Sequence, residues 1–394
     1  MRHFLFAVLF AAVSVAHAQS LFSFSNQPGE HGVGVRFVKQ YDGSRPFAKS
    51  RSFWAGGRAK DDLGRPIQTV IWYPAAKGGK AVQWNDYLSL IGWETNFNLS
   101  GAEEKRLVDG WIEMVTDGKR PAQVAAERAK PMWAVRGAVP TNGKFPVVIY
   151  APSINNTAFE NADLAEFLAS HGYIVISSPT IGAARRFIKW DLANAEMQAD
   201  DIRFLIDYAK TLPQADMSRV AAAGFSWGGF TNILAAVKDP RIKALVSMDG
   251  TLRYYNALVA EAKYAVPENI KTPLLYLAQR PASVEENIRI EQDLTGSFIG
   301  RMSKADVYML TMHPMEHVHF GSAFIRLDDA ADYQEYTADE VSFAYSLGAR
   351  YVLNFLNGYL KGDRSGLAYL TNRPVKNGAP PHSLVMQFTP AKYK

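Results

Sequence analysis

The chain has 394 residues, 48% of them apolar and 21% charged, which is the composition of a globular protein with enough apolar material for one large domain or two ordinary ones. Its net charge of +5 is small and dispersed, so a basic surface for binding nucleic acid is not expected. The sequence contains no cysteine, which excludes disulfides, thiolate metal sites and cysteine nucleophiles.

Residues 1–18 predict a secretory signal peptide. A short basic start precedes the apolar run Phe4–Val15, which is too short to cross a bilayer. The small residues Ala16 and Ala18 then flank a cleavage site, so the mature chain should begin at Gln19. We therefore expect an exported protein, periplasmic or secreted, with an uncleaved N-terminal anchor as the alternative. No later stretch of the sequence is long and apolar enough to cross a membrane.

The next part of the chain, Val33–Pro74, predicts β-structure. Gly32–Val38 and Gln68–Pro74 alternate apolar with other residues, as half-buried strands do, and Pro74 should end the second of them. The segment at 45–65 is rich in Gly, Arg and Pro and predicts a loop.

Residues 85–138 differ in character from their surroundings. The segments Ala102–Met114 and Pro121–Val135 have helical composition, and no strand is expected here. We interpret 85–138 as a helical insertion that could cover an active site as a lid. Its tryptophans, Trp93 and Trp111 among them, could contact a substrate, although packing in the core is the more frequent role of such residues.

From Phe145 onward, short apolar segments alternate with helical ones. Strands are predicted at 145–150, 173–177, 220–223, 244–248, 273–278 and, as the last, 305–311; helices are predicted at 158–170, 193–212, 230–237 and 347–360. This alternation predicts an α/β fold in which a mostly parallel sheet is covered by helices on both faces. The active site of such a sheet lies at the carboxyl ends of its strands.

A serine stands in a sharp turn between the strand at 220–223 and the helix that follows. Gly224, Ser226 and Gly228 form a Gly-x-Ser-x-Gly pattern, in which a side chain at either glycine would collide with the neighbouring strand or helix. The turn would expose the hydroxyl of Ser226 at a helix N-terminus, whose dipole favours developing negative charge. Ser226 is therefore the predicted nucleophile, with an ordinary glycine-rich turn as the alternative.

A serine nucleophile needs a histidine to accept its proton and an acid to orient that histidine. Asp249 directly follows the strand at 244–248, where it could reach a histidine above the sheet; its alternative role is to cap a turn before Gly250. The competing acids Glu285 and Glu286 come several residues after the next strand, in what resembles the first turn of a helix. Asp249 is therefore the favoured acid.

The histidine should follow the acid in the sequence, after the last predicted strand. His317 is favoured and His319 is the alternative, whereas His382 lies in a proline-rich tail and should be on the surface. His313 and His317 also match the inverted zinc-protease pattern His-x-x-Glu-His, which requires one helix carrying both histidines. Pro314 disfavours such a helix, so neither a metal nor another cofactor is expected.

Two backbone amides should bind the oxyanion that forms during attack. One belongs to Trp227, the residue after the nucleophile, and the other should come from the loop after the strand at 145–150. Ile154 is the favoured second donor and Ser153 the alternative, because Pro152 has no amide hydrogen. The side chain of Trp227 could shape an acyl pocket or simply pack on the sheet.

With these residues in place, the chain resembles the secreted α/β-hydrolases related to platelet-activating-factor acetylhydrolase and dienelactone hydrolase. The likeness is carried by the Ser226 turn, by Asp249, by His317 with Phe320 three residues later, and by the segments 34–36, 64–74, 145–150, 168–173 and 359–363. The resemblance implies an α/β-hydrolase fold, an acid after the strand that follows the nucleophile's strand, and a histidine followed by phenylalanine. The oxyanion loop departs from the family's usual His-Gly or Pro-Gly, and 85–138 has no counterpart that identifies a substrate.

The sequence therefore predicts an exported α/β-hydrolase that cleaves a carboxylic ester through Ser226, His317 and Asp249, with an acyl-enzyme intermediate. Its partner would be a small-molecule or polymer-borne ester, which Tyr254 and Tyr255 could contact unless they pack in the core. Hydrolysis of amides or peptides by the same triad is an alternative, because the pocket selects the leaving group. A non-catalytic binding protein on a hydrolase scaffold is another, and it predicts a missing triad residue.

Overall fold

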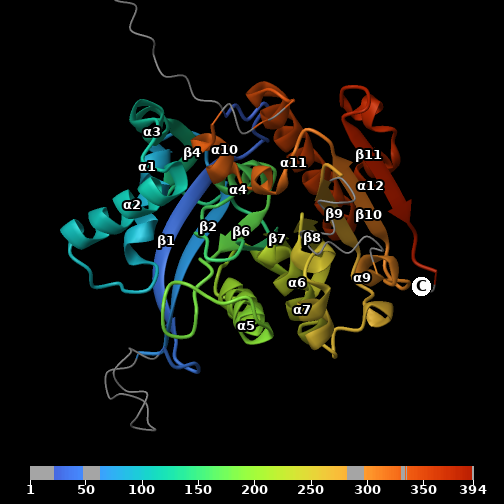
Figure 1. Cartoon of the computed structure of the whole chain (residues 1–394), viewed down its shortest axis with the longest axis horizontal. Coiled ribbons are helices and arrows are strands. Elements are labelled where there is room, and N and C mark those ends of the chain that lie inside the picture. Colours follow the sequence, from blue (N-terminus) through green and yellow to red (C-terminus); the bar gives the residue numbers. More distant parts are fainter. Residues whose placement is uncertain (1–21, 48–62, 282–296, 330–332, 334, 393–394) are drawn as a thin grey trace, which may run out of the picture.

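The computed structural model describes residues 22–47, 63–281, 297–329, 333 and 335–392. The expected signal peptide, most of the expected loop at 45–65, and the competing acids Glu285 and Glu286 lie outside the described residues. Figure 1 shows a twisted central sheet with helices packed on its faces. No helix in the described ranges is long and apolar enough to cross a membrane.

The described residues form one sheet of 11 strands, in the order β11-β10-β9-β8-β7-β5-β6-β2-β1-β4-β3. The strands are β1 (Gly32–Asp42), β2 (Arg65–Ala75), β3 (Ala81–Gln83), β4 (Pro131–Arg136), β5 (Phe145–Ala151), β6 (Ile174–Ser177), β7 (Ala215–Phe225), β8 (Ile242–Met248), β9 (Leu274–Gln279), β10 (Val307–Met312) and β11 (Leu384–Thr389). From β6 through β5, β7, β8 and β9 to β10, each strand is parallel to its neighbour. The predicted α/β fold with a mostly parallel sheet is thus confirmed.

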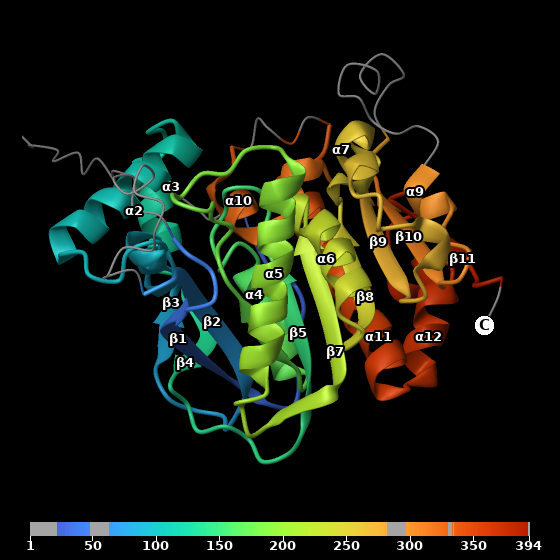
Figure 2. The same ribbon diagram turned by 90° about the horizontal axis from the view of Figure 1, so that it is seen from below.

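Helices cover both faces of this sheet. They are α1 (Trp84–Leu88), η1 (Ser89–Trp93), α2 (Gly101–Thr116), α3 (Pro121–Arg128), α4 (Ala162–Ser170), α5 (Leu192–Ala209), α6 (Trp227–Lys238), η2 (Thr251–Arg253), α7 (Asn256–Glu261), η3 (Pro267–Asn269), α9 (Ser297–Gly300), η4 (His317–Phe320), α10 (Ser322–Leu327), α11 (Ala338–Lys361), α12 (Arg364–Thr371) and η6 (Pro374–Asn377). Apolar residues of α4 and α11 belong to one buried cluster, and those of α5 and α6 to a second; Figure 2 shows these helices around the strands.

Successive residues of a strand point to opposite faces of a sheet, so each parallel strand contributes to both cores. In β5, Val148 and Tyr150 belong to the cluster beneath α4 and α11, whereas Val147 and Ile149 belong to the cluster beneath α5 and α6. A strand that is buried on both faces has to be apolar at consecutive positions. This explains the continuous apolar runs by which these strands were predicted.

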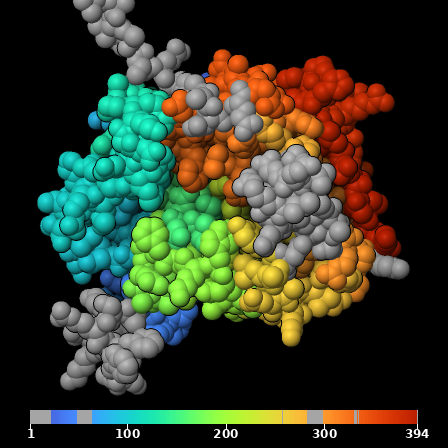
Figure 3. Space-filling model, in the orientation of Figure 1, coloured from blue at the N-terminus to red at the C-terminus, as the bar shows by residue number. Residues whose placement is uncertain are grey.

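The segment 85–138 is not purely helical, which corrects the sequence-based interpretation. Residues Pro131–Arg136 form β4, which pairs with β1 in parallel and with β3 in antiparallel orientation. Helix α3 ends at Arg128, and Met132 and Ala134 are buried while their neighbours in the strand are less so. Period-two burial of this kind is characteristic of a strand. The segment forms one side of the molecule and adjoins the surface of α10 (Figure 3).

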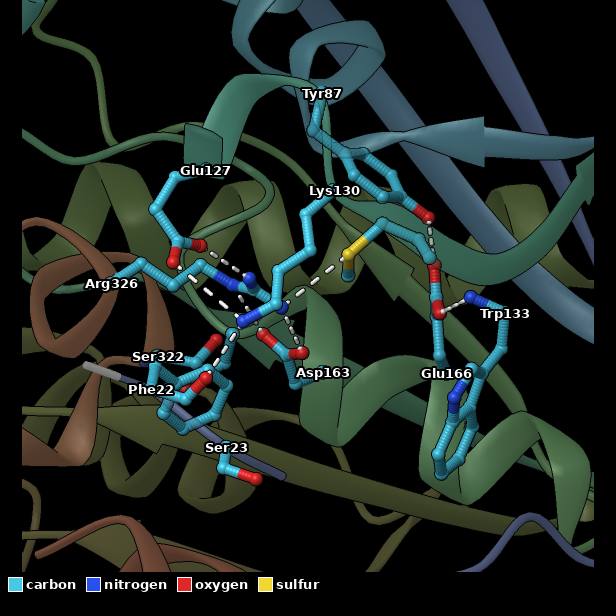
Figure 4. A network of polar contacts seen from close by, with 12 residues as sticks. Phe22, Ser23, Tyr87, Glu127, Lys130, Trp133, Asp163, Glu166, Ser322 and Arg326 are labelled. Atoms are coloured by element: carbon cyan, nitrogen blue, oxygen red, sulfur yellow. Dashed lines mark hydrogen bonds and ion pairs between the residues drawn. The ribbon is translucent and has the colours of Figure 1, made fainter. Parts of the chain in front are cut away.

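Buried charges attach this segment to the main body of the fold (Figure 4). Arg326 of α10 donates to Asp163 of α4 at 2.6 Å and to Glu127 of α3 at 2.8 Å, and all three side chains are buried. Glu166 of α4 accepts hydrogen bonds from the hydroxyl of Tyr87 and from the amide of Trp133, both in the inserted segment. Residues 84–136 are therefore tied to α4 and α10 by ion pairs and hydrogen bonds in the protein interior.

Other boundaries also differ from those expected. Strand β11 follows β10 at the sheet edge and pairs with it in antiparallel orientation, so the strand at 305–311 is not the last. Helix α11 begins at Ala338, where Thr337 and Glu340 form a capping box, rather than at 347. All residues of β2 are buried, Pro74 included, because β2 contributes side chains to both core clusters and is not a half-buried strand. His382 is exposed, as predicted.

Candidate active site

The turn that carries Ser226 joins β7 to α6 and is strained. Ser226 has a φ of 53° and a ψ of −114°, values that a residue with a side chain rarely adopts. A Cβ atom at Gly224 would lie 2.6 Å from the carbonyl carbon of Gly228, and one at Gly228 would lie 1.9 Å from the carbonyl oxygen of Ala151. Both glycines are therefore required by close backbone approach, which is the reason expected from the sequence.

Three side chains from the carboxyl ends of different strands meet at this turn. Nε2 of His317 lies 2.9 Å from Oγ of Ser226, and Nδ1 of His317 lies 2.6 Å from Oδ2 of Asp249. Asp249 directly follows β8, and His317 begins η4 after β10. The rings of Phe225 and Tyr254 flank the imidazole at centroid distances of 5.0 Å and 5.6 Å. The side chain of His317 is 38% exposed, so the same imidazole can also meet a ligand or water.

Asp249 is fully buried and has further donors besides His317. The hydroxyl of Tyr254 donates to its Oδ2 at 2.7 Å, and the amide of Gln279 donates to its Oδ1 at 3.1 Å. Burial, and after it the charge of Asp249, raises the pKa of Tyr254, so this hydroxyl stays protonated and donates. Tyr254 is 7% exposed and orients the acid, a role that the sequence did not reveal.

His319, the alternative base, lies in a different environment. It is buried, its Nδ1 accepts a hydrogen bond from the amide of Glu316 at 2.9 Å, and its Nε2 lies 3.3 Å from Asp328. Its ring packs against Tyr333 at a centroid distance of 5.2 Å. The structure therefore brings His317, and not His319, to the serine.

The pattern His-x-x-Glu-His does not form the helix that a zinc site of that type requires. His313 lies in a turn after β10, whereas His317 begins η4, with Pro314 between them. Within the part of the chain that the structure describes, no group of three or more His, Cys, Asp or Glu side chains is arranged to hold a metal ion.

The loop after β5 lies beside the serine turn, as the close approach of Gly228 to Ala151 shows. Within this loop the amide of Ser153 donates to the carboxylate of Glu160 at 3.0 Å and is therefore occupied. Asn155 has a φ of 57°, and its side chain accepts the amide of Ile188 at 2.6 Å. Ile154 stands between these two fixed residues, in a turn of the loop.

The aromatic residues suggested as substrate contacts fall into two groups. Trp93 and Trp111 are 9% exposed and belong to the core cluster beneath α4 and α11. Tyr255 is 41% exposed and its ring lies 4.7 Å from that of Trp190, which is 47% exposed. Trp190 in turn contacts the buried ring of Trp227 edge-to-face at 5.2 Å. Trp190, which the sequence did not single out, thus links an exposed aromatic pair to the residue after the serine.

Comparisons with known proteins agree with this geometry. Residues 122–316 match the family model described as X-Pro dipeptidyl-peptidase (S15 family). The "Probable 1-alkyl-2-acetylglycerophosphocholine esterase" of Arthroderma benhamiae is 27% identical over an alignment of 129 residues that covers 28% of this chain and 33% of that protein. This match thus spans about a third of that relative's length. The ferulic acid esterase from Streptomyces cinnamoneus superposes with a TM-score of 0.61 at 17% identity, over 94% of this chain and 99% of that one.

These similarities confirm the predicted resemblance at the level of fold and enzyme class. The family match includes Ser226 and Asp249 and ends directly before His317. The structural similarity extends over nearly the whole chain, including segments that the family match omits. The sheet order, the strained serine turn and the two sequence matches together identify the chain as an α/β-hydrolase of the serine hydrolase class.

Proposed function

We propose that this protein hydrolyses carboxylic esters through an acyl-enzyme on Ser226. Ser226 Oγ attacks the carbonyl carbon while His317 Nε2 accepts its proton, and Asp249 orients the imidazole and stabilises the imidazolium. His317 then donates the proton to the leaving alcohol and afterwards activates the water that releases the acid. The observation that carries the proposal is the pair of contacts, 2.9 Å and 2.6 Å long, that runs from Ser226 through His317 to Asp249.

The proposed oxyanion donors are the amides of Trp227 and Ile154. Trp227 is the first residue of α6, where a backbone amide has no acceptor within the helix. The amide of Ser153 already donates to Glu160, which supports Ile154 as the second donor. Both donors belong to backbone that is held in place before substrate binds, as effective stabilisation of an oxyanion requires.

Peptide hydrolysis by the same residues is the second candidate, and the match of 122–316 to a dipeptidyl-peptidase family model favours it. Ester hydrolysis is supported by the other two comparisons, since both proteins carry the name of an esterase. A triad alone does not distinguish the two reactions, because binding of the leaving group decides between them.

We further propose that the ester carries an aromatic ring close to the reacting carbonyl. The exposed rings of Trp190 and Tyr255 lie next to each other, and Trp190 contacts the residue that follows Ser226. Exposed aromatic side chains of this kind favour planar, apolar ligand groups. The similarity in fold to a ferulic acid esterase supports the same choice.

The experiment compares p-nitrophenyl acetate, butyrate and octanoate with Ala-Pro-p-nitroanilide, using purified protein that lacks residues 1–18. Ser226→Ala and His317→Ala should each lower kcat/KM by about 10³-fold or more on the preferred substrate, with no effect of a chelator. His319→Ala is the control, and its activity per folded molecule should stay within about threefold of the parent. Turnover of the anilide alone would establish the peptidase, and full activity of Ser226→Ala would exclude the serine mechanism.

We also propose that the protein is exported. The support is the pattern of residues 1–18, with its apolar run and the small residues Ala16 and Ala18. Expression of the full chain in a bacterial host, followed by cell fractionation and N-terminal sequencing, should find Gln19 as the first residue of periplasmic protein. Full-length protein in the cytosolic fraction would contradict this proposal.

A further inference from the structure

A buried carboxylate lies directly behind the loop that holds the proposed oxyanion donor Ile154. Glu160 is fully buried, and its carboxylate accepts hydrogen bonds from the hydroxyl of Tyr150 at 2.8 Å and from the amide of Ser153 at 3.0 Å. The hydroxyl of Ser153 and the side-chain amide of Asn156 also donate to it at close range. Each end of the loop segment 153–156 is therefore fixed to the same carboxylate.

The next residue, Asn161, connects this carboxylate to the loop that carries His317. Its Nδ2 donates to the carbonyl of Phe320 at 2.8 Å, and its Oδ1 accepts the amide of Ser322 at 2.9 Å. The same Nδ2 donates to the hydroxyl of Tyr150, which itself donates to Glu160. A continuous set of buried hydrogen bonds thus joins the oxyanion loop to the segment just after His317.

The hydrogen-bond donors around residue 160 favour an ionised carboxylate over an amide at this position. The backbone amide of Ser153 and the side-chain amide of Asn156 face different oxygens of Glu160 and can only donate, and the hydroxyls of Tyr150 and Ser153 donate as they are placed; an ionised carboxylate accepts all four hydrogen bonds. Burial works against ionisation and raises the pKa of Glu160 to about 7. A glutamine would be less costly to bury, but its amide nitrogen would face another donor.

We propose that Glu160, together with Asn161, is a positioning residue that fixes the oxyanion loop relative to His317 while touching neither substrate nor the reacting atoms. The inference rests on the proposed function and specifies how its site is held together. An oxyanion donor contributes only when it lies at hydrogen-bond distance from the oxygen of the tetrahedral intermediate. Loosening segment 153–156 should therefore impair the transition state and leave the binding of the ground-state ester almost unchanged.

The test uses Glu160→Gln with Glu166→Gln as its matched control. Glu166 is a second fully buried glutamate, and burial raises its pKa to about 7 as well, but its partners are Tyr87 and Trp133 rather than the oxyanion loop. On p-nitrophenyl acetate, with active sites titrated by a phosphonate ester, Glu160→Gln should lower kcat about 10- to 100-fold and change KM less than about threefold. Glu166→Gln should keep kcat within about twofold of the parent.

A second readout reports on the oxyanion geometry directly. Phenylboronic acid forms a tetrahedral adduct with a serine nucleophile, so its inhibition constant should rise in Glu160→Gln by about the factor by which kcat falls, and should not change in Glu166→Gln. Should Glu160→Gln fail to fold, Ser153→Ala removes one donor from the same contact at little change in volume. That variant should lower kcat about three- to tenfold without a change in KM.

The outcomes separate this inference from the proposed function. Equal losses of kcat in Glu160→Gln and Glu166→Gln would overturn the positioning role and leave the proposed esterase activity intact. The same holds if Glu160→Gln has fewer titratable active sites but an unchanged kcat per titrated site. An unchanged kcat in both Glu160→Gln and Ser153→Ala would also overturn it. Undiminished hydrolysis by Ser226→Ala would instead overturn the proposed function itself.

Discussion

Protonation of Glu160 is expected to govern activity near neutral pH, in addition to protonation of the base. Below about pH 7 the carboxyl takes up a proton, because burial has raised its pKa to about that value, and it then no longer accepts all of its donors. Protonation of Glu160 should lower kcat by about the 10- to 100-fold expected for Glu160→Gln, in addition to any loss from protonation of the base, so log kcat of the parent should fall more steeply below about pH 7 than that of the variant, until this loss is complete. In Glu160→Gln the additional fall should be absent.

The measurement is kcat for p-nitrophenyl acetate between about pH 5 and pH 9 in both proteins, with Glu166→Gln expected to follow the parent. Among the described residues, the titratable group in contact with Glu160 is Tyr150. A second phenol, that of Tyr345, donates to Asn161, the residue after Glu160. Burial raises the pKa of both phenols, so they stay neutral throughout this range. The same additional fall in Glu160→Gln would assign this ionisation to a group other than Glu160.

At the residue scale, the sequence predicted those site residues that obey a local pattern or a fixed order. Ser226 follows from its flanking glycines, and Asp249 and His317 follow from their places after strands; the structure brings these three together. The roles of Tyr254 and Asn161 could not be predicted, because they depend on partners that only folding brings close. Asn161 and Phe320, for example, are 159 positions apart in the sequence.

At the scale of elements, Arg326 is expected to determine whether the inserted segment stays attached. Replacing it by alanine leaves Asp163 and Glu127 buried without their main counter-charge, which should lower the free energy of unfolding by about 3–5 kcal/mol. Urea unfolding measures this loss, and hydrogen exchange should show the largest loss of protection in α3 and β4. Lys105→Ala, which removes the exposed ion pair with Asp109, should cost less than about 1 kcal/mol.

Equal effects of Arg326→Ala and Lys105→Ala would show that the buried network contributes little to stability. Global loss of protection without any preference for α3 and β4 would show that the inserted segment unfolds only with the whole molecule. The interior ion pairs of Arg326 argue against both outcomes: they anchor 84–136 at α4 and α10 and confine any lid motion to parts of the segment away from them.

The loop between β6 and α5 is expected to select the substrate through Trp190. If its ring contacts an aromatic group of the ester, Trp190→Ala should lower kcat/KM for methyl cinnamate about 5- to 10-fold, since one aromatic contact is worth roughly 1 kcal/mol. The same variant should leave kcat/KM for methyl butyrate within about twofold. Phe388→Ala is the control, because Phe388 is also an exposed aromatic residue but lies on the edge strand β11. Equal losses on both esters would argue against an aromatic subsite.

Strands β4 and β11 illustrate why some elements were not predicted. The sequence of β4, Pro-Met-Trp-Ala-Val-Arg, does not alternate apolar with polar residues, so the alternating burial of Met132 and Ala134 appears only in the fold. Strand β11 follows α12 and a proline-rich turn, and within the described ranges its only strand neighbour is β10 at the edge of the sheet. Edge strands acquire much of their stability from such pairing, so propensity alone identifies them poorly.

At the scale of the whole molecule, the order of strands and helices after Phe145 was sufficient to predict the sheet. Parallel strands joined by helices leave few alternatives for connection, which explains why the site could be expected at their carboxyl ends. The strands β2, β1, β4 and β3 on one side and β11 on the other extend this sheet to 11 strands in the described part of the chain. How far a sheet extends depends on pairing between distant segments, which local patterns do not specify.

Three buried glutamates should make the stability of the whole molecule fall as the pH rises from about 5.5 to 8. Burial raises the pKa of Glu94, Glu160 and Glu166 from 4.5 to about 7. A group whose pKa is higher in the folded state stabilises the fold fully below its unfolded pKa, and this contribution disappears as the pH passes its folded value. Each glutamate should thus contribute about 2 kcal/mol more at pH 5.5 than at pH 8.

Urea unfolding at both pH values measures the effect, and Glu166→Gln isolates one contribution. Glutamine does not titrate, so the difference in unfolding free energy between the two pH values should shrink by about 2 kcal/mol in this variant. Glu113→Gln, on the exposed face of α2, should leave the difference unchanged. Carboxyls whose pKa is lowered in the folded state, such as that of Asp239, lose their contribution to stability only in more acidic solution. They therefore do not mask the fall in stability between about pH 5.5 and pH 8. A parent protein that is more stable at pH 8 than at pH 5.5 would show that these glutamates are ionised in the folded state throughout this range, with their hydrogen bonds outweighing the cost of burial.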